Sequence, residues 1–240
     1  MKKCIQGFTL LEMALALFIS ALLLGGLLPA LSGRVEQQRL SEARAQLEEI
    51  RQAAIGYAIA NGRLPCPASA ASNGEESYAA SGNAANGACS NPYDGYAPTV
   101  TLGIANALDP WGSRIRYAVS LSNSNAWTRT GGIADVTTLT PNLLVCDTAI
   151  GISASACASG TMIASGVPLI IYSTGGNGAQ GGISPDEAAN PNPNSNDNNR
   201  TFVSHAPSAA TSAGGAFDDV MIWLSPNVLY ARMAEAGKLP

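Results

Sequence analysis

The most uniform stretch of the sequence is an apolar segment near its N-terminus. Nearly all side chains from Met13 to Leu31 are apolar or small. A helix over residues 8–32 would be about 37 Å long at 1.5 Å per residue, enough to cross a hydrocarbon core of about 30 Å. We therefore expect residues 8–32 to form a transmembrane helix. Lys2 and Lys3 precede it and favour a cytoplasmic N-terminus, so the rest of the chain is expected to be exported.

After this segment the pattern changes to that of an amphipathic helix. Apolar residues recur at alternating steps of three and four, which predicts one apolar face, at Leu40, Ala43, Leu47, Ile50, Ala54 and Tyr57. We expect residues 33–61 to continue the first helix and to dock a globular part onto it. Gly62 suits the position after the last helical residue, and the prolines that follow cannot continue a helix.

The remaining residues, 62–240, predict a globular domain of short strands and long loops. Runs with β character occur at 114–121, 143–146, 167–174 and 220–224, and a terminal helix is expected at 226–237. Residues 68–97 and the polar stretch 190–199 are predicted to be loops, the second on the surface. The fold class expected is α+β, with the long N-terminal helix packed on a small antiparallel β-sheet.

Composition narrows the possible functions. Charged residues make up 12% of the chain, the formal net charge is −4, and His205 is the one histidine. No basic stripe follows the N-terminal segment, so we expect no nucleic-acid partner. We find no catalytic set, because His205 lies in a polar region and is expected on the surface. The glycine-rich run that begins at Gly175 lacks the ending of a phosphate loop.

The cysteines suggest an exported domain with disulfides. The chain has five cysteines; if Cys4 leaves with a leader, an even number remains. Pairing by proximity joins Cys66 to Cys89 and Cys146 to Cys157. Four cysteines allow three connectivities, and the sequence does not choose among them.

Glu12 is out of place in an apolar run, since inserting a carboxylate there costs a few kcal/mol, so it requires a partner. The segment Gly7-Phe8-Thr9-Leu10-Leu11-Glu12 follows a short basic leader and opens the apolar helix. In this it resembles the type IV pilin and pseudopilin family. Pro29 also falls where many members of that family have a kinking proline.

The resemblance implies a processing pathway and a location. A prepilin peptidase would cleave the leader, residues 1–7, between Gly7 and Phe8, and Phe8 would then be N-methylated. Glu12 would pair with the cationic amine of Phe8 on a neighbouring subunit, a contact that fixes register. The implied partners are the peptidase, other pilin or pseudopilin subunits and an inner-membrane assembly platform. The implied location is the bacterial inner membrane, with a single span, a periplasmic C-terminal domain and an assembled filament.

Two simpler interpretations of the N-terminus explain less of its sequence. An ordinary secretory signal, cut after Ala30-Leu31-Ser32, has a shorter apolar stretch and gives Glu12 no purpose. A plain membrane anchor explains the length of the segment but not the six residues from Gly7 to Glu12. The pilin-like interpretation accounts for both features.

Three further segments resemble parts of type II secretion major pseudopilins. The first, Gly62-Arg63-Leu64-Pro65, is similar to the turn that ends their long helix. The second, Asp109-Pro110-Trp111-Gly112, is similar to a tight turn of theirs, and we expect Trp111 to fill the gap between helix and sheet. The run from Ile170 to Gly178 and the pair Asp218-Asp219 resemble the two ends of their calcium loop. This implies a candidate Ca²⁺ site at Asn177, Asp218 and Asp219, although Asn177 stands where an acidic ligand is common and the aspartates could simply solvate the start of a strand.

The function expected is therefore a structural subunit of a type II secretion pseudopilus. The alternative is a minor pilin of a type IV pilus, acting in adhesion, motility or DNA uptake. The long insertions and the cysteines depart from the pseudopilin pattern and leave both open. A membrane-anchored hydrolase is a poor third class, because no nucleophile motif is present.

Overall fold

The computed structural model describes residues 9–105, 108–134, 139–178, 184–190 and 199–239, without the side chains of residues 23–32. The chain forms two compact units, Met1–Ser41 and Glu42–Pro240. Helix α1 (Leu10–Asn61) supplies the helical part of the first unit and the opening helix of the second.

The C-terminal half of α1 carries the predicted apolar face. Its fully buried side chains lie one helical turn apart, at Ala43, Leu47, Ile50, Ala54 and Ala58. On the solvent-facing side of the helix, Arg51 forms an ion pair with Glu48 at 2.8 Å, as expected for oppositely charged residues three positions apart. The helix ends at Asn61, and Gly62 follows with φ of 66°, a left-handed conformation that glycine adopts without strain.

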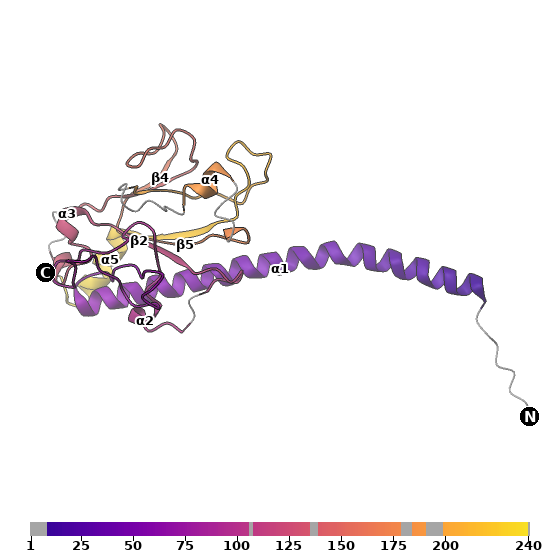
Figure 1. Ribbon diagram of the computed structural model, residues 1–240, viewed down its shortest axis with the longest axis horizontal. Coiled ribbons are helices and arrows are strands. Elements are labelled where there is room, and N and C mark those ends of the chain that lie inside the picture. The colour runs from indigo at the N-terminus through magenta and orange to yellow at the C-terminus, as the bar shows by residue number, and fades with distance from the viewer. Residues whose placement is uncertain (1–8, 106–107, 135–138, 179–183, 191–198, 240) are drawn as a thin grey trace, which may run out of the picture. The chain divides into compact units, whose positions relative to one another are not determined.

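The first sheet is antiparallel throughout and has the order β1-β2-β5-β7. Its strands are β1 (Gly95–Tyr96), β2 (Arg116–Val119), β5 (Leu169–Ser173) and β7 (Val220–Leu224). Every residue of the central strand β5 is buried. Arg51 of α1 donates a hydrogen bond to the carbonyl of Trp223 in β7, and Figure 1 shows this sheet beside the C-terminal half of α1. The expected helix on a small antiparallel sheet is confirmed.

A second sheet was not predicted. It has the order β4-β3-β6, from β4 (Met162–Val167), β3 (Leu143–Cys146) and β6 (Thr201–Val203). β3 pairs antiparallel with β4 but parallel with β6. Only β3 was expected, because β4 is rich in small residues and β6 has three residues, too few for a period-2 pattern to appear.

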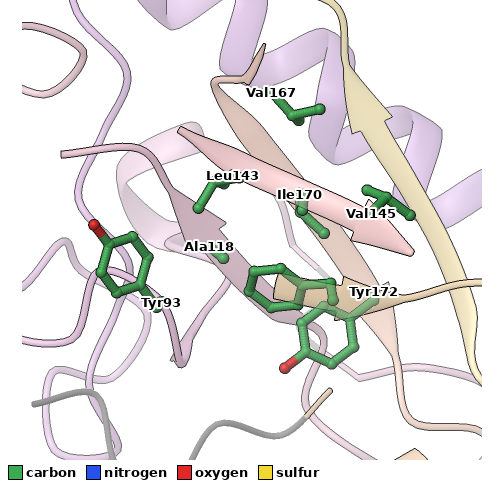
Figure 2. Close-up of a cluster of buried hydrophobic side chains, with 8 residues drawn as sticks. Tyr93, Ala118, Leu143, Val145, Val167, Ile170 and Tyr172 are labelled. Carbon is green, nitrogen blue, oxygen red and sulfur yellow. The ribbon is translucent and has the colours of Figure 1, made fainter. Parts of the chain in front are cut away.

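The main hydrophobic core lies between the two sheets. Its side chains come from strands of both sheets and from Tyr93, which precedes β1, as Figure 2 shows for the residues it labels. The cluster consists of Tyr93, Ala118, Leu143, Val145, Val167, Ile170, Tyr172 and Phe202. Neighbouring residues of β2 and β5, such as Tyr117 and Ile171, are also fully buried, and successive side chains of a strand point to opposite faces. The first sheet is therefore covered on both sides.

Short helices occupy the connections. They are α2 (Thr99–Leu102), α3 (Ser122–Asn125), a 3₁₀ turn η1 (Gly132–Ala134), α4 (Pro185–Ala188) and α5 (Pro226–Glu235). The predicted terminal helix is confirmed by α5, which buries Leu229 and Met233. Its Tyr230 ring stacks on the buried Trp127 with ring centroids 6.1 Å apart.

Candidate functional site

The first candidate site is the start of α1, where Thr9 and Glu12 form a reciprocal capping box. The backbone N–H and the hydroxyl of Thr9 each donate to Glu12 Oε2 at 2.9 Å, and the backbone N–H of Glu12 donates to Thr9 Oγ1 at 3.2 Å. Such a box satisfies N–H groups that a helix start leaves unpaired. It holds the Glu12 carboxylate at the N-terminal end of the helix, beside Thr9. Sequence reasoning assigned Glu12 to a neighbouring subunit and overlooked this local role.

The turns that follow Thr9 expose apolar side chains on every side. Exposure reaches 92% at Leu10, and the large apolar side chains exposed in this stretch are Leu10, Leu11, Met13, Leu15, Leu17, Phe18, Ile19 and Leu22. A helix that is apolar all round is stable only when lipid or other helices surround it. Glu12 is the one charged side chain between residues 9 and 22.

The predicted span 8–32 is described only in part. Among the described residues, no helix combines the length and the apolarity required of a membrane-crossing segment. The cleavage position, Gly7 and Phe8, lies outside the described residues, as do the side chains of residues 23–32. The span, the cleavage and the methylation therefore remain predictions.

The second candidate site joins the Asp-Pro-Trp-Gly turn to the glycine loop. Asp109 Oδ1 accepts backbone hydrogen bonds from Trp111 at 3.1 Å and from Ser113 at 2.8 Å, which closes the turn. Asp109 Oδ2 accepts from the hydroxyl of Ser173, the last residue of β5, at 2.5 Å. Trp111 lies against Gly176, where an added Cβ would be 3.3 Å from the indole. Trp111 therefore contacts the glycine loop, whereas we expected it in the gap between helix and sheet.

The acidic residues near this loop are arranged differently from the sequence prediction. Glu187 Oε1 accepts from Asn177 Nδ2 at 2.9 Å and from the backbone N–H of Asp218 at 3.2 Å. Asp218 Oδ2 accepts from the backbone N–H of Gly176 at 3.0 Å. Asn177 and Asp218 therefore lie together, joined by Glu187, which sequence reasoning missed. Glu187 follows Ser184-Pro185-Asp186, an N-cap pattern that could have marked a short helix there.

Asp219 points elsewhere, toward the buried Asn190. Its Oδ2 accepts from Asn190 Nδ2 at 2.6 Å, and Asn190 also exchanges two hydrogen bonds with the backbone of Val203. Asn190 is fully buried, so its assignment to a surface loop was wrong; residues 191–198 lie outside the described residues. Burial, and then the charges of Glu187 and Asp218, raise the pKa of Asp219 to about 7.

His205 is partly buried, with 18% of its side chain exposed. Its Nε2 lies 3.2 Å from Asp186 Oδ2 and its Nδ1 lies 2.7 Å from the carbonyl of Ala206, while its ring stacks on Phe217. Both ring nitrogens thus face acceptor atoms. Neither nitrogen is directed at a side chain that could serve as a nucleophile.

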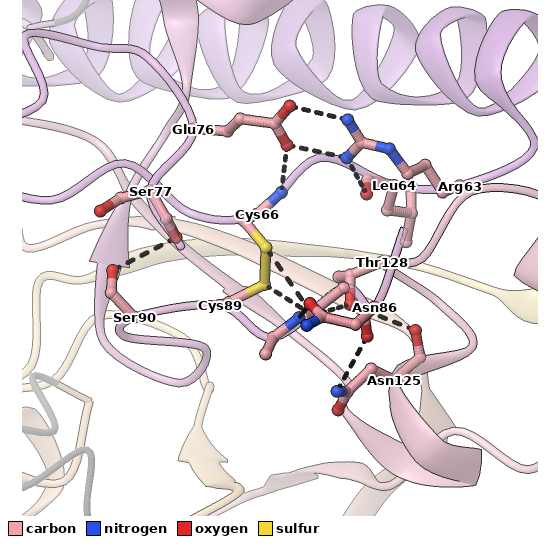
Figure 3. The surroundings of a disulfide bond; sticks show 12 residues. Arg63, Leu64, Cys66, Glu76, Ser77, Asn86, Cys89, Ser90, Asn125 and Thr128 are labelled. Atoms are coloured by element: carbon pink, nitrogen blue, oxygen red, sulfur yellow. Dashed lines mark hydrogen bonds and ion pairs between the residues drawn. A yellow bond between two sulfur atoms is a disulfide. The ribbon is translucent and has the colours of Figure 1, made fainter. Parts of the chain in front are cut away.

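The four cysteines of the globular unit form two disulfides, Cys66–Cys89 and Cys146–Cys157. This is the pairing by proximity. Beside the first disulfide, Arg63 and Glu76 form a forked ion pair with two bonds of 2.7 Å (Figure 3). Glu76 also accepts a hydrogen bond from the backbone N–H of Cys66, so the ion pair and the disulfide stabilise the same turn.

Comparison with known proteins identifies the N-terminal segment. Residues 2–28 match the family model described as the prokaryotic N-terminal methylation motif. The match includes Gly7, Phe8, Thr9 and Glu12. No curated protein and no solved structure matches the chain.

Proposed function

We propose that this chain, whose N-terminal methylation motif is the signature of type IV pilin-like prepilin proteins, is a structural subunit of a type II secretion pseudopilus. The observation that carries the proposal is the start of α1, a capped helix that is apolar all round and holds one carboxylate. That is the form of a segment that passes from lipid into a bundle of identical helices. A minor pilin of a type IV pilus shares this segment and is the second candidate.

In this proposal, prepilin peptidase removes residues 1–7 and Phe8 becomes the methylated N-terminus. Gly7 offers no side chain to obstruct the enzyme, so Gly7→Val is expected to retain the leader. Residues 8–32 hold the subunit in the inner membrane until an assembly platform draws it into the filament. Mass spectrometry of the N-terminus checks the step, and a mature chain beginning at Phe8 in Gly7→Val would contradict it.

Glu12 then supplies the assembly contact. Its carboxylate stands at the helix end, where the Phe8 amine of an adjacent subunit would find it among apolar side chains. Breaking a buried ion pair by removing one partner costs about 3–5 kcal/mol. Since 1.4 kcal/mol is about tenfold, this corresponds to a loss of hundreds-fold or more in the assembly equilibrium.

The capping box allows the charge of Glu12 to be tested separately from its hydrogen bonds. A glutamine can still accept from Thr9, so Glu12→Gln keeps the cap and removes the charge. We expect this variant to be cleaved and inserted but not incorporated when a tagged copy is expressed with the wild type. Sheared filaments and crosslinks between neighbours measure incorporation. Glu36→Gln, at an exposed residue of the same helix, is the matched control. Normal incorporation of Glu12→Gln would show that Glu12 only caps its own helix.

The contact between Trp111 and the glycine loop supports the secretion branch over the pilus branch. Two segments that resemble major pseudopilins, far apart in the sequence, lie together here and are linked through Asp109 and Ser173. Deletion of the gene is expected to abolish secretion of folded exoenzymes. Intact secretion with loss of twitching, attachment or DNA uptake would select the minor pilin instead.

We also propose calcium at the glycine loop, with Asn177 and Asp218 as side-chain ligands. Asn177 Oδ1 is buried and has no hydrogen-bond partner, which fits an oxygen atom that coordinates a cation. Among the described residues no group of three or more acidic, histidine or cysteine side chains could hold a metal. The remaining oxygen ligands would therefore come from main-chain carbonyls, which Ca²⁺ accepts.

Unfolding of the full chain in detergent micelles tests the calcium proposal. Calcium is expected to raise the unfolding temperature and to change the fluorescence of Trp111, and Asp218→Asn should abolish both effects. Asp147→Asn, which removes an exposed carboxylate elsewhere, should leave them unchanged. An equal response of the wild type and Asp218→Asn would remove calcium from this loop.

A further inference from the structure

Tyr96 lies beside two guanidinium groups. The Arg114 guanidinium carbon is 5.1 Å from the centre of the Tyr96 ring, and that of Arg116 is 4.7 Å from it. The sheet explains this arrangement, because Tyr96 pairs with Arg116 across β1 and β2. Arg114 is two residues earlier and so projects to the same side as Arg116. A guanidinium over a tyrosine face is attracted by the ring, so the ring holds both cations in place.

The charges of this group do not cancel. Arg116 donates to Asp94 Oδ1 at 2.8 Å, forming a partly buried ion pair. Arg114 donates to the carbonyl of Ala70 at 3.2 Å and forms no ion pair with the described residues. Two guanidiniums and one carboxylate leave a net charge of about +1, on a chain whose formal net charge is −4.

Two hollows meet at this group, and Tyr96 and Arg114 line both. The smaller, about 160 Å³, is polar and is completed by Ser113, Arg116, Thr174 and Gly178. The larger, about 250 Å³, has a mixed lining, with Ala68, Ala97 and Ile115 beside the polar Ser69, Asn73 and Thr99. A polar cationic hollow therefore adjoins a less polar one.

We propose that this paired hollow binds the C-terminal carboxylate of a partner polypeptide that ends in a small apolar residue. The carboxylate would lie in the polar hollow between Arg114 and Arg116, whose guanidiniums match its fork of two oxygens. The apolar part would lie against Ala68, Ala97 and Ile115. The adjoining, less polar hollow suits an organic carboxylate better than inorganic phosphate, because phosphate has no apolar part to place there. The N-terminal helix takes no part, so the proposal is independent of the filament function.

The test uses N-acetyl-dialanine and its C-terminal amide as probes. Each is titrated into the full chain in detergent micelles and followed by the NMR signals of the arginine Nε–H groups. The acid is expected to shift Arg114 and Arg116 and to bind at least about tenfold more tightly than the amide, since a hydrogen bond to a charged group is worth about 1.5–3 kcal/mol. Equal binding of acid and amide would overturn the proposal.

Variants locate the site. Arg114→Gln is expected to weaken binding of the acid about tenfold or more, and Arg114→Lys, which keeps the charge but not the fork, to weaken it less. Arg129→Gln removes the same charge from an exposed arginine that lines neither hollow, and should bind as the wild type does. Unchanged binding by Arg114→Gln would refute the site, provided that its unfolding temperature is also unchanged. Inorganic phosphate is the competing oxyanion, and tighter binding of phosphate than of the acid would exclude the carboxylate assignment.

Discussion

The two disulfides of this protein stand in contrasting surroundings. The Cys66–Cys89 bond closes a loop of 23 residues and both of its cysteines are buried. The Cys146–Cys157 bond closes a loop of 11 residues, and residues 153–156 between its cysteines are exposed. The loss of chain entropy in the unfolded state alone predicts that either disulfide stabilises the fold by about 3 kcal/mol. A clear difference in stabilisation between the two disulfides must therefore come from the residues that surround each one.

The surroundings of the first disulfide are polar and buried. The Arg63 side chain is 6% exposed and that of Glu76 is 16% exposed, and their ion pair adjoins Tyr57, whose hydroxyl accepts from Arg63 at 2.6 Å. Thr128 donates to the carbonyl of Gly87 in the same loop at 2.7 Å. The second loop has no ion pair among its described residues. The ion pair, more than the sulfur bridge, therefore distinguishes the two regions.

The largest expected effect follows removal of the Glu76 charge. Glu76→Gln leaves the Arg63 guanidinium buried without a counter-charge, which should cost about 3–5 kcal/mol of unfolding free energy. Urea unfolding of the full chain in micelles, followed by circular dichroism, measures this loss. Glu75→Gln, at the exposed neighbouring residue, should change stability by less than about 0.5 kcal/mol. Similar losses in the two variants would show that the ion pair is no stronger than a surface pair.

The next largest effect is expected from removing each disulfide in turn, and the two losses of unfolding free energy should differ. Replacing Cys66 and Cys89 together by serine is expected to cost about 3–5 kcal/mol, because two buried hydroxyls replace the bridge near the ion pair. The same change at Cys146 and Cys157 should cost about 2–3 kcal/mol, since Cys157 is partly exposed. The same urea measurement gives both values. A larger loss at the second pair would reverse the comparison.

Acid should weaken the first region selectively. Burial raises the pKa of Glu76, but the hydrogen bonds and the charge of Arg63 outweigh burial, and the pKa lies below its usual value of 4.5. A lowered pKa in the folded state adds stability above pH 4.5, and that stability is lost as the pH falls through the folded-state pKa. Wild-type stability should therefore drop below about pH 4.5 more steeply than that of Glu76→Gln. Parallel pH profiles for the two proteins would contradict this assignment.

The smallest expected effect concerns a threonine in each region. Thr128→Val leaves the buried carbonyl of Gly87 without its donor and should cost about 1–2 kcal/mol. Thr161 makes a similar bond to the carbonyl of Ala158 at 3.0 Å, but it is only partly buried. Thr161→Val should therefore cost less than about 0.5 kcal/mol. Thermal unfolding of the two variants compares the regions at the level of single hydrogen bonds.

Much of the fold could be predicted where the signal is local. The end of α1 at Gly62, the apolar face from Ala43 to Ala54 and the four strand segments with clear β character are present in the structure. The second sheet could not be predicted, because β6 follows β3 by more than fifty residues and pairs with it in parallel. Parallel pairing leaves no hairpin signal in the sequence.

The candidate sites divide in the same way. Gly7, Phe8 and Glu12 lie within six consecutive residues, so the sequence alone made them candidates, and their roles in cleavage, methylation and assembly stay predictions. The cap that Glu12 forms with Thr9 was overlooked. Asn177 and Asp218 were predicted to meet, but Glu187, which joins them, was missed. Asp219 was placed in the same group, yet it faces Asn190, because the direction of a side chain at a strand start depends on which face the sheet buries.

The sequence by itself determined the elements whose causes lie within a few residues: the apolar N-terminal segment with its motif, the helix end at Gly62, and cysteines close enough to pair. Only the tertiary structure decided which distant groups meet: Arg63 with Glu76, Glu187 with Asn177, and Asp219 with Asn190. The physical reason is that burial selects these partners. A buried charge or amide must find its counterpart wherever the packed sheets and loops bring one within reach, and spacing along the chain does not encode that distance.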